Sequence, residues 1–236
     1  MEILIFEDSD LVSKKVGNII INQIDKKPDI NLGLATGRTM IPIYKELLIL
    51  YKNKKIDYSK VKTFNIDEYF NLLIRDKNSY HYYMDKLFFK HINIKPENIH
   101  FPSAINPSSY DKLIKKFGGI DIMILGIGKN GHIAFNEPGS SIKSKTRIVK
   151  LADSTRKPNS QFFKEGRVPQ KAVSVGISTI LKSKLIILIA TGKGKAETIA
   201  KTIKSKPSSK IPASFLKRHK NVLFILDKNA AGKLNF

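Results

Sequence analysis

Short apolar runs that alternate with helical patterns are the feature that most limits how this chain can fold. Between the runs, apolar residues recur at the spacing of one helix face, as in 9–25. The apolar runs are EILIF at 2–6, NLGLA at 31–35, DIMIL at 121–125, KLIILIA at 184–190 and VLFIL at 222–226. This alternation is typical of βαβ units, and runs without polar interruption fit strands that are covered on both faces. The chain is therefore predicted to be an α/β protein with a mostly parallel sheet.

Weaker patterns complete the prediction. Further strands are expected at 60–65, 145–151 and 172–176, and further helices at 41–51, 79–90, 108–117, 155–164 and 193–204. The stretch NIHF at 98–101 is expected in a connection. The best loop candidate, SKPSSK at 205–210, is too short to separate domains. One domain spanning 1–236 is expected.

The composition excludes several classes of protein. With 236 residues and 42% hydrophobic content the chain can bury a core. It contains no cysteine, which excludes disulfides, a cysteine nucleophile and thiolate metal ligands. The sequence has no apolar run of about 18 residues, so no membrane partner is expected. Its acidic beginning, MEILIFEDSD, is expected to be a strand and not a signal peptide. A cytoplasmic protein is expected.

The formal net charge of +22 has two interpretations. A basic surface gives non-specific affinity for nucleic acids. However, the lysine pairs are scattered, at 14–15, 26–27, 54–55 and 115–116, and no aromatic residues are interleaved to stack on bases. We therefore expect no specific nucleic-acid partner. The same charge would attract a small anionic substrate.

Three polar segments follow predicted strands. They are LATGRTM at 34–40, NIDEY at 65–69 and GIGKNGHIAFNEPGSS at 126–141. In parallel α/β sheets, ligands bind at the carboxyl ends of the strands. The three segments are therefore expected to be loops that converge on one ligand site.

The first of these segments has the composition of an anion site. Gly37 allows close approach to the backbone before a helix N-terminus, while Thr36, Arg38 and Thr39 add hydroxyls and a positive charge. An ordinary capped turn would have the same residues. The segment is not the nucleotide P-loop, because the G-K-[ST] ending is missing.

The other two segments contain titratable residues. Asp67, followed by Glu68, is either part of a surface loop or a carboxylate shielded by aromatic residues that moves protons. His132 and Glu137 are either structural or an acid/base pair. The loop holds one histidine and no H-x-x-x-H spacing, so no metal is expected.

These segments occur in a larger pattern that resembles the glucosamine-6-phosphate deaminase family, over about residues 31–231. The matching blocks are GLATGRTM, TFNIDEY, SYHYYM, NIHF, GIGKNGHIAFNEPGSS, KTRI, STRKPNSQFF, VPQKAVSVGISTIL, ATGKGKA and PASFLKRHKN, in family order and spacing. The resemblance implies a Rossmann-like three-layer α/β/α sandwich. It also implies an enzyme that converts glucosamine 6-phosphate and water into fructose 6-phosphate and ammonium without a cofactor.

The resemblance also assigns roles to residues. Asp67 matches the base that moves a proton between C2 and C1 of the sugar. His132 matches the ring-opening residue, assisted by Glu137, and Asn130 stands where many members have an aspartate that completes a relay with the histidine. Thr36, Gly37, Arg38, Thr39 and Lys195 match the segments that hold the phosphate.

Three positions depart from the family pattern. Asn130 is able to orient His132 through its amide, but it cannot accept a proton. Gln161 replaces an arginine that usually reaches the phosphate, and Arg38 stands where many relatives have glycine, so the charge is expected to have moved to Arg38. Val149 replaces a lysine of the allosteric members, and the longer C-terminal segment of those members does not follow. A monomer or small homo-oligomer is expected in preference to an allosteric hexamer.

Two alternatives to the deaminase stay open from the sequence. One is a sugar-phosphate-binding regulatory domain without enzymatic activity, although no helix-turn-helix pattern flanks the fold. The other is a related phosphosugar lactonase or isomerase, which shares the fold and a similar glycine–histidine loop but for which the FNIDEY block is not expected.

Overall fold

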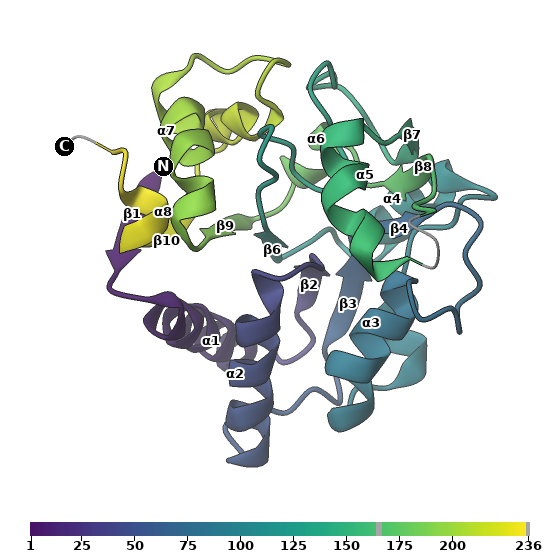
Figure 1. The fold of residues 1–236 in the computed structure, drawn as a ribbon. Coiled ribbons are helices and arrows are strands. Elements are labelled where there is room, and N and C mark those ends of the chain that lie inside the picture. Colours follow the sequence, from purple (N-terminus) through teal and green to yellow (C-terminus); the bar gives the residue numbers. More distant parts are fainter. Residues whose placement is uncertain (164–166, 235–236) are drawn as a thin grey trace.

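A seven-stranded parallel sheet forms the centre of the protein, which we describe from a computed structural model covering residues 1–163 and 167–234. The strand order is β1-β10-β9-β6-β2-β3-β5 (Figure 1). The strands are β1 (Glu2–Phe6), β2 (Asn31–Leu34), β3 (Lys62–Asn65), β5 (Ile99–His100), β6 (Ile122–Leu125), β9 (Leu185–Ala190) and β10 (Val222–Asp227). All neighbouring pairs run parallel. The predicted α/β fold with a mostly parallel sheet is confirmed.

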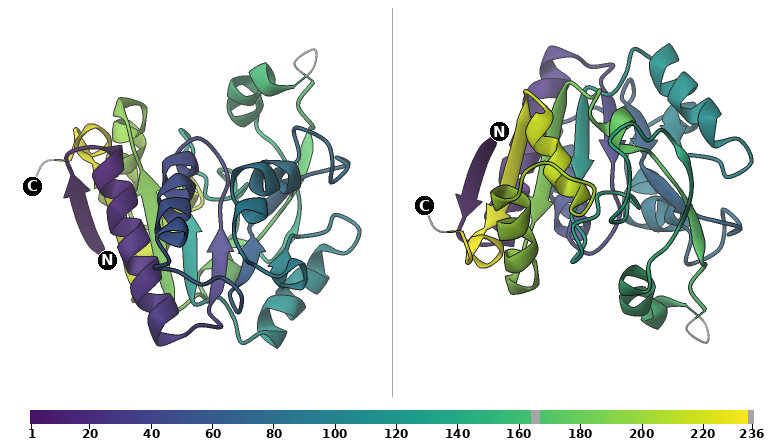
Figure 2. Two further views of the ribbon diagram at one scale, coloured as in Figure 1. Left: turned by 90° about the horizontal axis from the view of Figure 1, so that it is seen from below. Right: turned by 90° about the horizontal axis from the view of Figure 1, so that it is seen from above.

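Helices cover both faces of this sheet. The described helices are α1 (Ser9–Lys26), α2 (Met40–Lys52), α3 (Tyr80–Leu87), α4 (Pro107–Lys116), α5 (Asp153–Asn159), α6 (Ile177–Ile180), α7 (Ala196–Lys204) and α8 (Lys228–Ala231). Short 3₁₀ helices are η1 (Phe89–His91), η2 (Pro96–Asn98), η3 (Ser160–Phe162), η5 (Lys193–Lys195) and η6 (Pro212–Arg218). The helices α1, α2 and α3 lie together on one side of the sheet, and α7 lies on the other (Figures 1 and 2).

The direction of the chain explains this distribution. From β1 to β5 the chain moves towards one edge of the sheet, and from β5 through β6 to β10 it moves back across the sheet to the other edge. Crossovers between parallel strands are right-handed, so the two directions place their helices on opposite faces. Because of this reversal, β2 and β6 are neighbours, and the connections that follow them lead to opposite edges of the sheet.

The central strands are apolar because both of their faces are covered. All four residues of β6 are buried, and in β9 the five residues Ile186–Ala190 are buried. On α1, the buried residues Val12, Val16 and Ile20 are spaced four apart, which makes one face of the helix. Asp8 begins this helix by accepting hydrogen bonds from the N–H groups of Asp10 and Leu11, each 2.9 Å long.

A second, antiparallel sheet was not predicted as a separate sheet, although two of its strands were expected, at 145–151 and 172–176. It contains β4 (Asp67–Tyr69), β8 (Lys171–Ser174) and β7 (Arg147–Lys150), in that order. The segment NIDEY was expected to be a loop, and this expectation was wrong, because residues 67–69 pair with β8. The chain passes from the large sheet to the small one within Asn65–Asp67.

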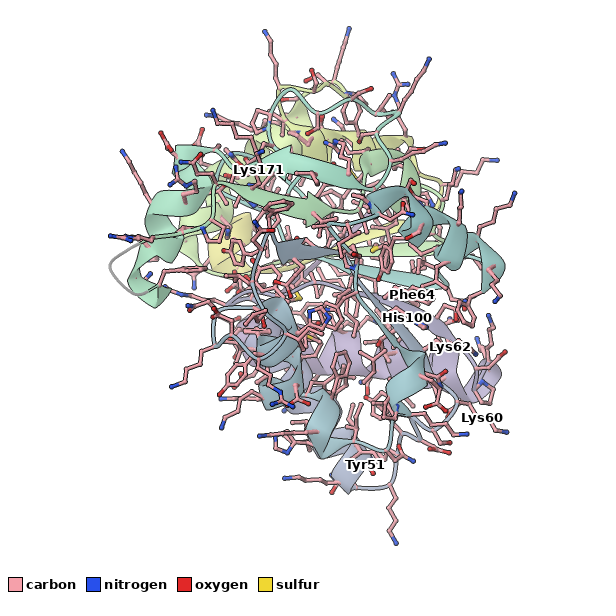
Figure 3. The ribbon with its side chains drawn as sticks, turned by 90° about the vertical axis from the view of Figure 1, so that its right-hand side faces the viewer. Tyr51, Lys60, Lys62, Phe64, His100 and Lys171 are labelled. Carbon is pink, nitrogen blue, oxygen red and sulfur yellow. The ribbon has the colours of Figure 1, made fainter. Side chains whose placement is uncertain are left out.

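Smaller differences lie at the edge of the large sheet. Residues 99–100 form the short strand β5, which was expected to be a connection, and the rings of His100 and Phe64 lie side by side across β5 and β3 with centroids 4.8 Å apart (Figure 3). The predicted helix at 155–164 is α5 followed by η3, and its last residue, 164, lies outside the described residues. None of the described helices has the length and apolar content that a membrane span requires.

Candidate active site

Four adjacent strands of the large sheet lead into the segments that the sequence singled out. In sheet order, β9 precedes the Lys195 turn, β6 precedes the His132 loop, β2 precedes Thr36–Thr39, and β3 continues directly into β4 with Asp67. The chain reverses direction between β2 and β6. Open α/β sheets bind ligands at such a switch point, at the carboxyl ends of the strands.

His132, Glu137 and Asn130 form one hydrogen-bonded group in the loop after β6. The Nδ1 atom of His132 lies 3.3 Å from Oε2 of Glu137. The amide of Asn130 donates to the same carboxylate oxygen at 2.6 Å, and its oxygen accepts the backbone N–H of His132 at 3.2 Å. Asn130 was expected to orient the imidazole itself, whereas its contacts hold the backbone of His132 and the carboxylate of Glu137.

The surroundings of Glu137 keep its carboxylate ionised. Burial raises the pKa of Glu137, but the hydrogen bond and charge of His132 and the hydrogen bonds from Thr155 and Asn130 outweigh it and lower the pKa to about 2. An ionised Glu137 beside Nδ1 stabilises a protonated imidazole. Because Nδ1 faces Glu137, the other ring nitrogen, Nε2, is the one left to exchange protons with a ligand.

Glycines make room for this imidazole. A Cβ atom added to Gly128 would lie 2.2 Å from Cε1 and 2.4 Å from both ring nitrogens of His132. Gly131, which begins the turn back to His132, has a φ of 84°, a conformation that glycine adopts without steric cost. Ala134 has a φ of 49°, which is uncommon for a residue with a side chain and marks local backbone strain between His132 and Glu137.

We expect Gly128→Ala to reduce kcat by about ten- to a hundredfold, because the new methyl group displaces the imidazole and misplacement by about 1 Å costs on this order. Gly128 is not among the glycines with positive φ, so the backbone itself accepts alanine. The matched control is Gly126→Ala, whose Cβ would lie 3.6 Å from Met40, an ordinary contact. Steady-state kinetics and thermal unfolding of both variants check this. Equal activities of the two variants would contradict the packing argument.

Asp67 is buried at the start of β4, with 6% of its surface exposed. Its Oδ1 atom has no hydrogen-bond partner among the described residues. Burial, and after it the charge of Glu68, raise the pKa of Asp67 well above its ordinary value. A carboxylate with a raised pKa and an uncommitted oxygen is suited to accept and return a proton.

The small sheet connects Asp67 to the His132 loop. Ser174 on β8 is the register partner of Asp67. Its hydroxyl accepts the backbone N–H of Phe135 at 3.0 Å. The strand that carries Asp67 and the loop that carries Glu137 therefore meet at one residue of β8.

The segment after β2 is held by tyrosines of α3. The hydroxyl of Tyr83 donates to the carbonyl of Gly37 at 2.9 Å, and the hydroxyl of Tyr80 is hydrogen-bonded to Thr36. Gly37 has a φ of 103° and Arg38 is exposed. Thr39 precedes α2 and makes no side-chain cap bond. The first two N–H groups of α2, those of Met40 and Ile41, donate to the carbonyls of Gly37 and Arg38 at 3.0 and 3.3 Å.

Lys195 follows β9, which neighbours β6 on the side opposite to β2, and it reaches the His132 loop. Its ammonium donates to the carbonyl of Ile127 at 2.6 Å. Burial, and after it the charge of Lys129, lower the pKa of Lys195. The turn that carries it is fixed by Asp227, whose two carboxylate oxygens accept the N–H of Gly192 at 3.0 and 2.9 Å.

Two residues of the site were missed by the sequence reasoning. Thr155 on α5 donates to Oε1 of Glu137 at 2.6 Å and lies 3.4 Å from Nδ1 of His132. Arg147 on β7 donates to Asn136 at 2.9 Å and to Ser140 at 3.3 Å, on both sides of Glu137. No local pattern distinguishes Thr155 from other threonines near a helix start. The KTRI block contained Arg147, but only as a matching motif.

Gln161, which replaces the arginine usual in the family pattern, is exposed on η3.

Within residues 1–163 and 167–234, no three histidine, aspartate or glutamate side chains are grouped as metal ligands would be.

Comparisons with known proteins agree on one family. The family model of glucosamine-6-phosphate isomerases and 6-phosphogluconolactonases matches residues 8–225. A glucosamine-6-phosphate deaminase of Clostridium botulinum (strain Alaska E43 / Type E3) is 50% identical over 100% of this chain and 97% of its own length. One from Thermoanaerobacter sp. (strain X514) is 47% identical over 98% of this chain and 94% of its own length.

Solved structures give the same result. A structure described as a monomeric glucosamine-6-phosphate deaminase has a TM-score of 0.96 and 39% identity, and the match covers 99% of this chain and 100% of that one. The 6-phosphogluconolactonase of Thermotoga maritima has a TM-score of 0.76 at 21% identity, over 96% of this chain and 99% of that one, which shows a shared fold. The chain belongs to the family of glucosamine-6-phosphate isomerases and 6-phosphogluconolactonases.

Proposed function

We propose that this protein is an enzyme that converts glucosamine 6-phosphate and water into fructose 6-phosphate and ammonium. The observation that carries the proposal is the pairing of two separate proton-transfer groups at one switch point: His132 with its ionised partner Glu137, and the buried Asp67. Relatives named glucosamine-6-phosphate deaminase, which are 50% and 48% identical to this chain, support it.

His132 opens the sugar ring. Its Nε2 atom takes the proton of the anomeric hydroxyl and delivers a proton to the ring oxygen, so that the C1–O5 bond breaks and an aldehyde forms at C1. During this transfer the imidazole is cationic, and the Glu137 carboxylate 3.3 Å from Nδ1 stabilises that state. Asn130 and Thr155 hold the carboxylate in place.

Asp67 then isomerises the open chain. It removes the proton from C2 while the C1 oxygen takes a proton from the substrate's ammonium group, which gives an enolamine with a C1–C2 double bond and a C1 hydroxyl. Asp67 then returns its proton to C1. The resulting iminium at C2 adds water, and the C2–N bond breaks to release ammonium and leave the ketone. One carboxylate suffices because both carbons are neighbours.

The phosphate is proposed to lie between the segment after β2 and the Lys195 turn. Thr36, Gly37, Arg38 and Thr39 offer hydroxyls, backbone N–H groups and a guanidinium at the start of α2. The ammonium of Lys195 adds charge from the opposite side. Both segments lie next to the His132 loop. A phosphate bound between them would therefore place the sugar next to His132.

Incubation of the purified protein with glucosamine 6-phosphate tests the proposal. Ammonium and fructose 6-phosphate are expected in equal amounts. Hydrolysis of 6-phosphogluconolactone without ammonium release from the amino sugar would instead support the lactonase alternative. Binding of the sugar phosphate with no product would support the regulatory domain.

The remaining properties are also proposals. A single domain, acting as a monomer or small homo-oligomer, is supported by the monomeric relative with a TM-score of 0.96. A cytoplasmic location is supported by the charge of the substrate, which confines sugar phosphates within cells. Activity without a cofactor or metal is expected because proton transfers account for every step, and activity that is lost on chelation and restored by a divalent ion would contradict this.

We expect Arg38→Gly and Lys195→Ala each to raise KM for the phosphorylated sugar by about ten- to a hundredfold, with kcat less affected, since charge-assisted contacts to an anion contribute about 1.5–3 kcal/mol. Lys193→Ala, which removes an exposed lysine of the same turn, is the control. Gln161→Arg is expected to rescue Arg38→Gly in part. An unchanged KM in Arg38→Gly would show that the charge has not moved to Arg38.

A further inference from the structure

We propose that His81 is a positioning residue that acts through Glu68: it sets the charge beside Asp67 and thereby the lowest pH at which the enzyme turns over. The inference rests on the proposed function, in which Asp67 must be ionised to accept the proton from C2. It concerns two residues that take no part in the steps described above.

Glu68 has a different task from its neighbour Asp67. Successive residues of a strand point to opposite faces, so the two carboxylates separate at once. Glu68 accepts the backbone N–H groups of Tyr69 at 2.8 Å, Tyr80 at 2.9 Å and His81 at 3.0 Å. Two of these belong to the first turn of α3, where a negative charge is favoured. Glu68 is thus a fixed, buried anion beside the proposed base.

His81 provides the fourth contact to Glu68. Its Nδ1 atom lies 2.8 Å from Oε2 of Glu68, and its ring stacks on Phe101 with centroids 3.6 Å apart and planes 21° apart. The His81 side chain is 28% exposed, so protons reach it from solvent. Histidine is the side chain that ordinarily changes charge between about pH 5 and 8.

The other groups that face Asp67 from neighbouring elements do not change their charge in this range. Tyr44 of α2, Tyr80 of α3 and Tyr110 of α4 face it with hydroxyls whose pKa values burial raises further, so they stay neutral. On β8, the register partner Ser174 is uncharged. Arg147 follows on β7 in the same row, and its guanidinium, which donates to the neutral Asn136 and Ser140, stays positive throughout this range and adds a constant field.

The sign of the effect follows from these contacts. Burial is the largest cause of the raised pKa of Asp67, and the negative charge of Glu68 is the second. A protonated His81 cancels part of that charge, so Asp67 ionises at lower pH and serves as a base there. Without the histidine charge, Glu68 acts in full, and Asp67 stays protonated to higher pH.

The test is the pH profile of kcat for wild type, His81→Asn, His81→Phe and Glu68→Gln. The amide of His81→Asn keeps a donor near the position of Nδ1, whereas His81→Phe keeps the stacking on Phe101. Both are expected to move the acid limb upward by about 0.5–1 pH unit. Well below the wild-type limb, kcat should fall about three- to tenfold, and at the plateau it should change little. Glu68→Gln is expected to move the limb downward.

The opposite signs separate charge from structure. A purely structural role predicts that His81→Asn recovers the wild-type profile, and that the other variants lose kcat at every pH; either result would overturn the proposal. His91→Asn, an exposed histidine on η1, is the control and should leave the limb in place. If Glu68→Gln does not fold, the two His81 variants decide alone.

A second measurement needs no turnover. The ¹³C resonance of the Asp67 carboxyl, titrated in wild type and in His81→Asn, should show the same upward displacement in the variant. Coincident titration curves would reject the role of His81 even if the protein releases no ammonium. Absence of ammonium together with displaced curves would reject the proposed function and leave the coupling intact.

Discussion

Asp67→Asn is expected to be both nearly inactive and more stable than the wild type. A positioned acid/base group contributes about 10²- to 10⁴-fold to turnover, and an amide cannot accept the proton from C2. Burial and the Glu68 charge disfavour the ionised form of Asp67 in the folded protein. Removing that charge should raise the free energy of unfolding at pH 7 by about 1–3 kcal/mol.

The pH dependence of this gain is fixed by its sign. Because the pKa of Asp67 is raised on folding, the carboxyl destabilises the protein above its unfolded pKa of about 3.9 and not below it. Urea unfolding at pH 7 and near pH 3.5 should therefore show the gain at the higher pH alone. Asp111→Asn is the control. This carboxylate accepts hydrogen bonds from Thr146 and Thr179, so its loss should lower stability and leave turnover nearly unchanged.

Turnover within tenfold of wild type in Asp67→Asn would exclude Asp67 as the base. Inactivity without any gain in stability would place its carboxylate in a more polar environment than the buried position described above.

His132→Gln is expected to lower kcat for deamination of the ring-closed sugar by about 10²- to 10³-fold. Glutamine keeps a polar group beside Glu137 but cannot carry a proton from the anomeric hydroxyl to the ring oxygen. Fructose 6-phosphate has a larger acyclic fraction, so the reverse reaction with ammonium should lose less. Stopped assays of both directions measure the two losses.

The same substitution at an exposed histidine, His91→Gln, should leave both directions unchanged. A loss confined to the reverse direction would contradict ring opening by His132. Equal losses in the two directions would not separate ring opening from the later steps, because the reverse reaction also closes a ring. The rates with an open-chain analogue of the substrate would then decide.

The large sheet could be predicted from the sequence because its strands are covered on both faces. Runs such as LIILIA at 185–190 have no polar alternation and allow few other structures. The small sheet could not be predicted in the same way. β4 is three residues long, and its residues, Asp-Glu-Tyr, include two that are depleted in strands. Pairing with β8, distant in the sequence, makes it a strand.

The site shows the same division between local and distant contacts. The group of Asn130, His132 and Glu137 lies within one loop, so sequence spacing was enough to suggest it. Thr155 and Arg147 reach that loop from α5 and β7, through contacts that depend on the folded arrangement of the small sheet. The role of Glu68 was likewise hidden, because its partners lie on α3, twelve and thirteen residues further along the chain.

Because β3 continues into β4, the position of each residue along the strand decides which of two chemically similar carboxylates faces which side. Asp67 and Glu68 differ by one methylene group, yet one faces the proposed substrate side and the other begins a helix, because a strand turns each successive residue over. Deleting or inserting one residue between Asn65 and Asp67 would turn each carboxylate to the opposite face while leaving both of them in the chain. In evolutionary terms, a change of length by a single codon here should be as damaging as the loss of Asp67 itself.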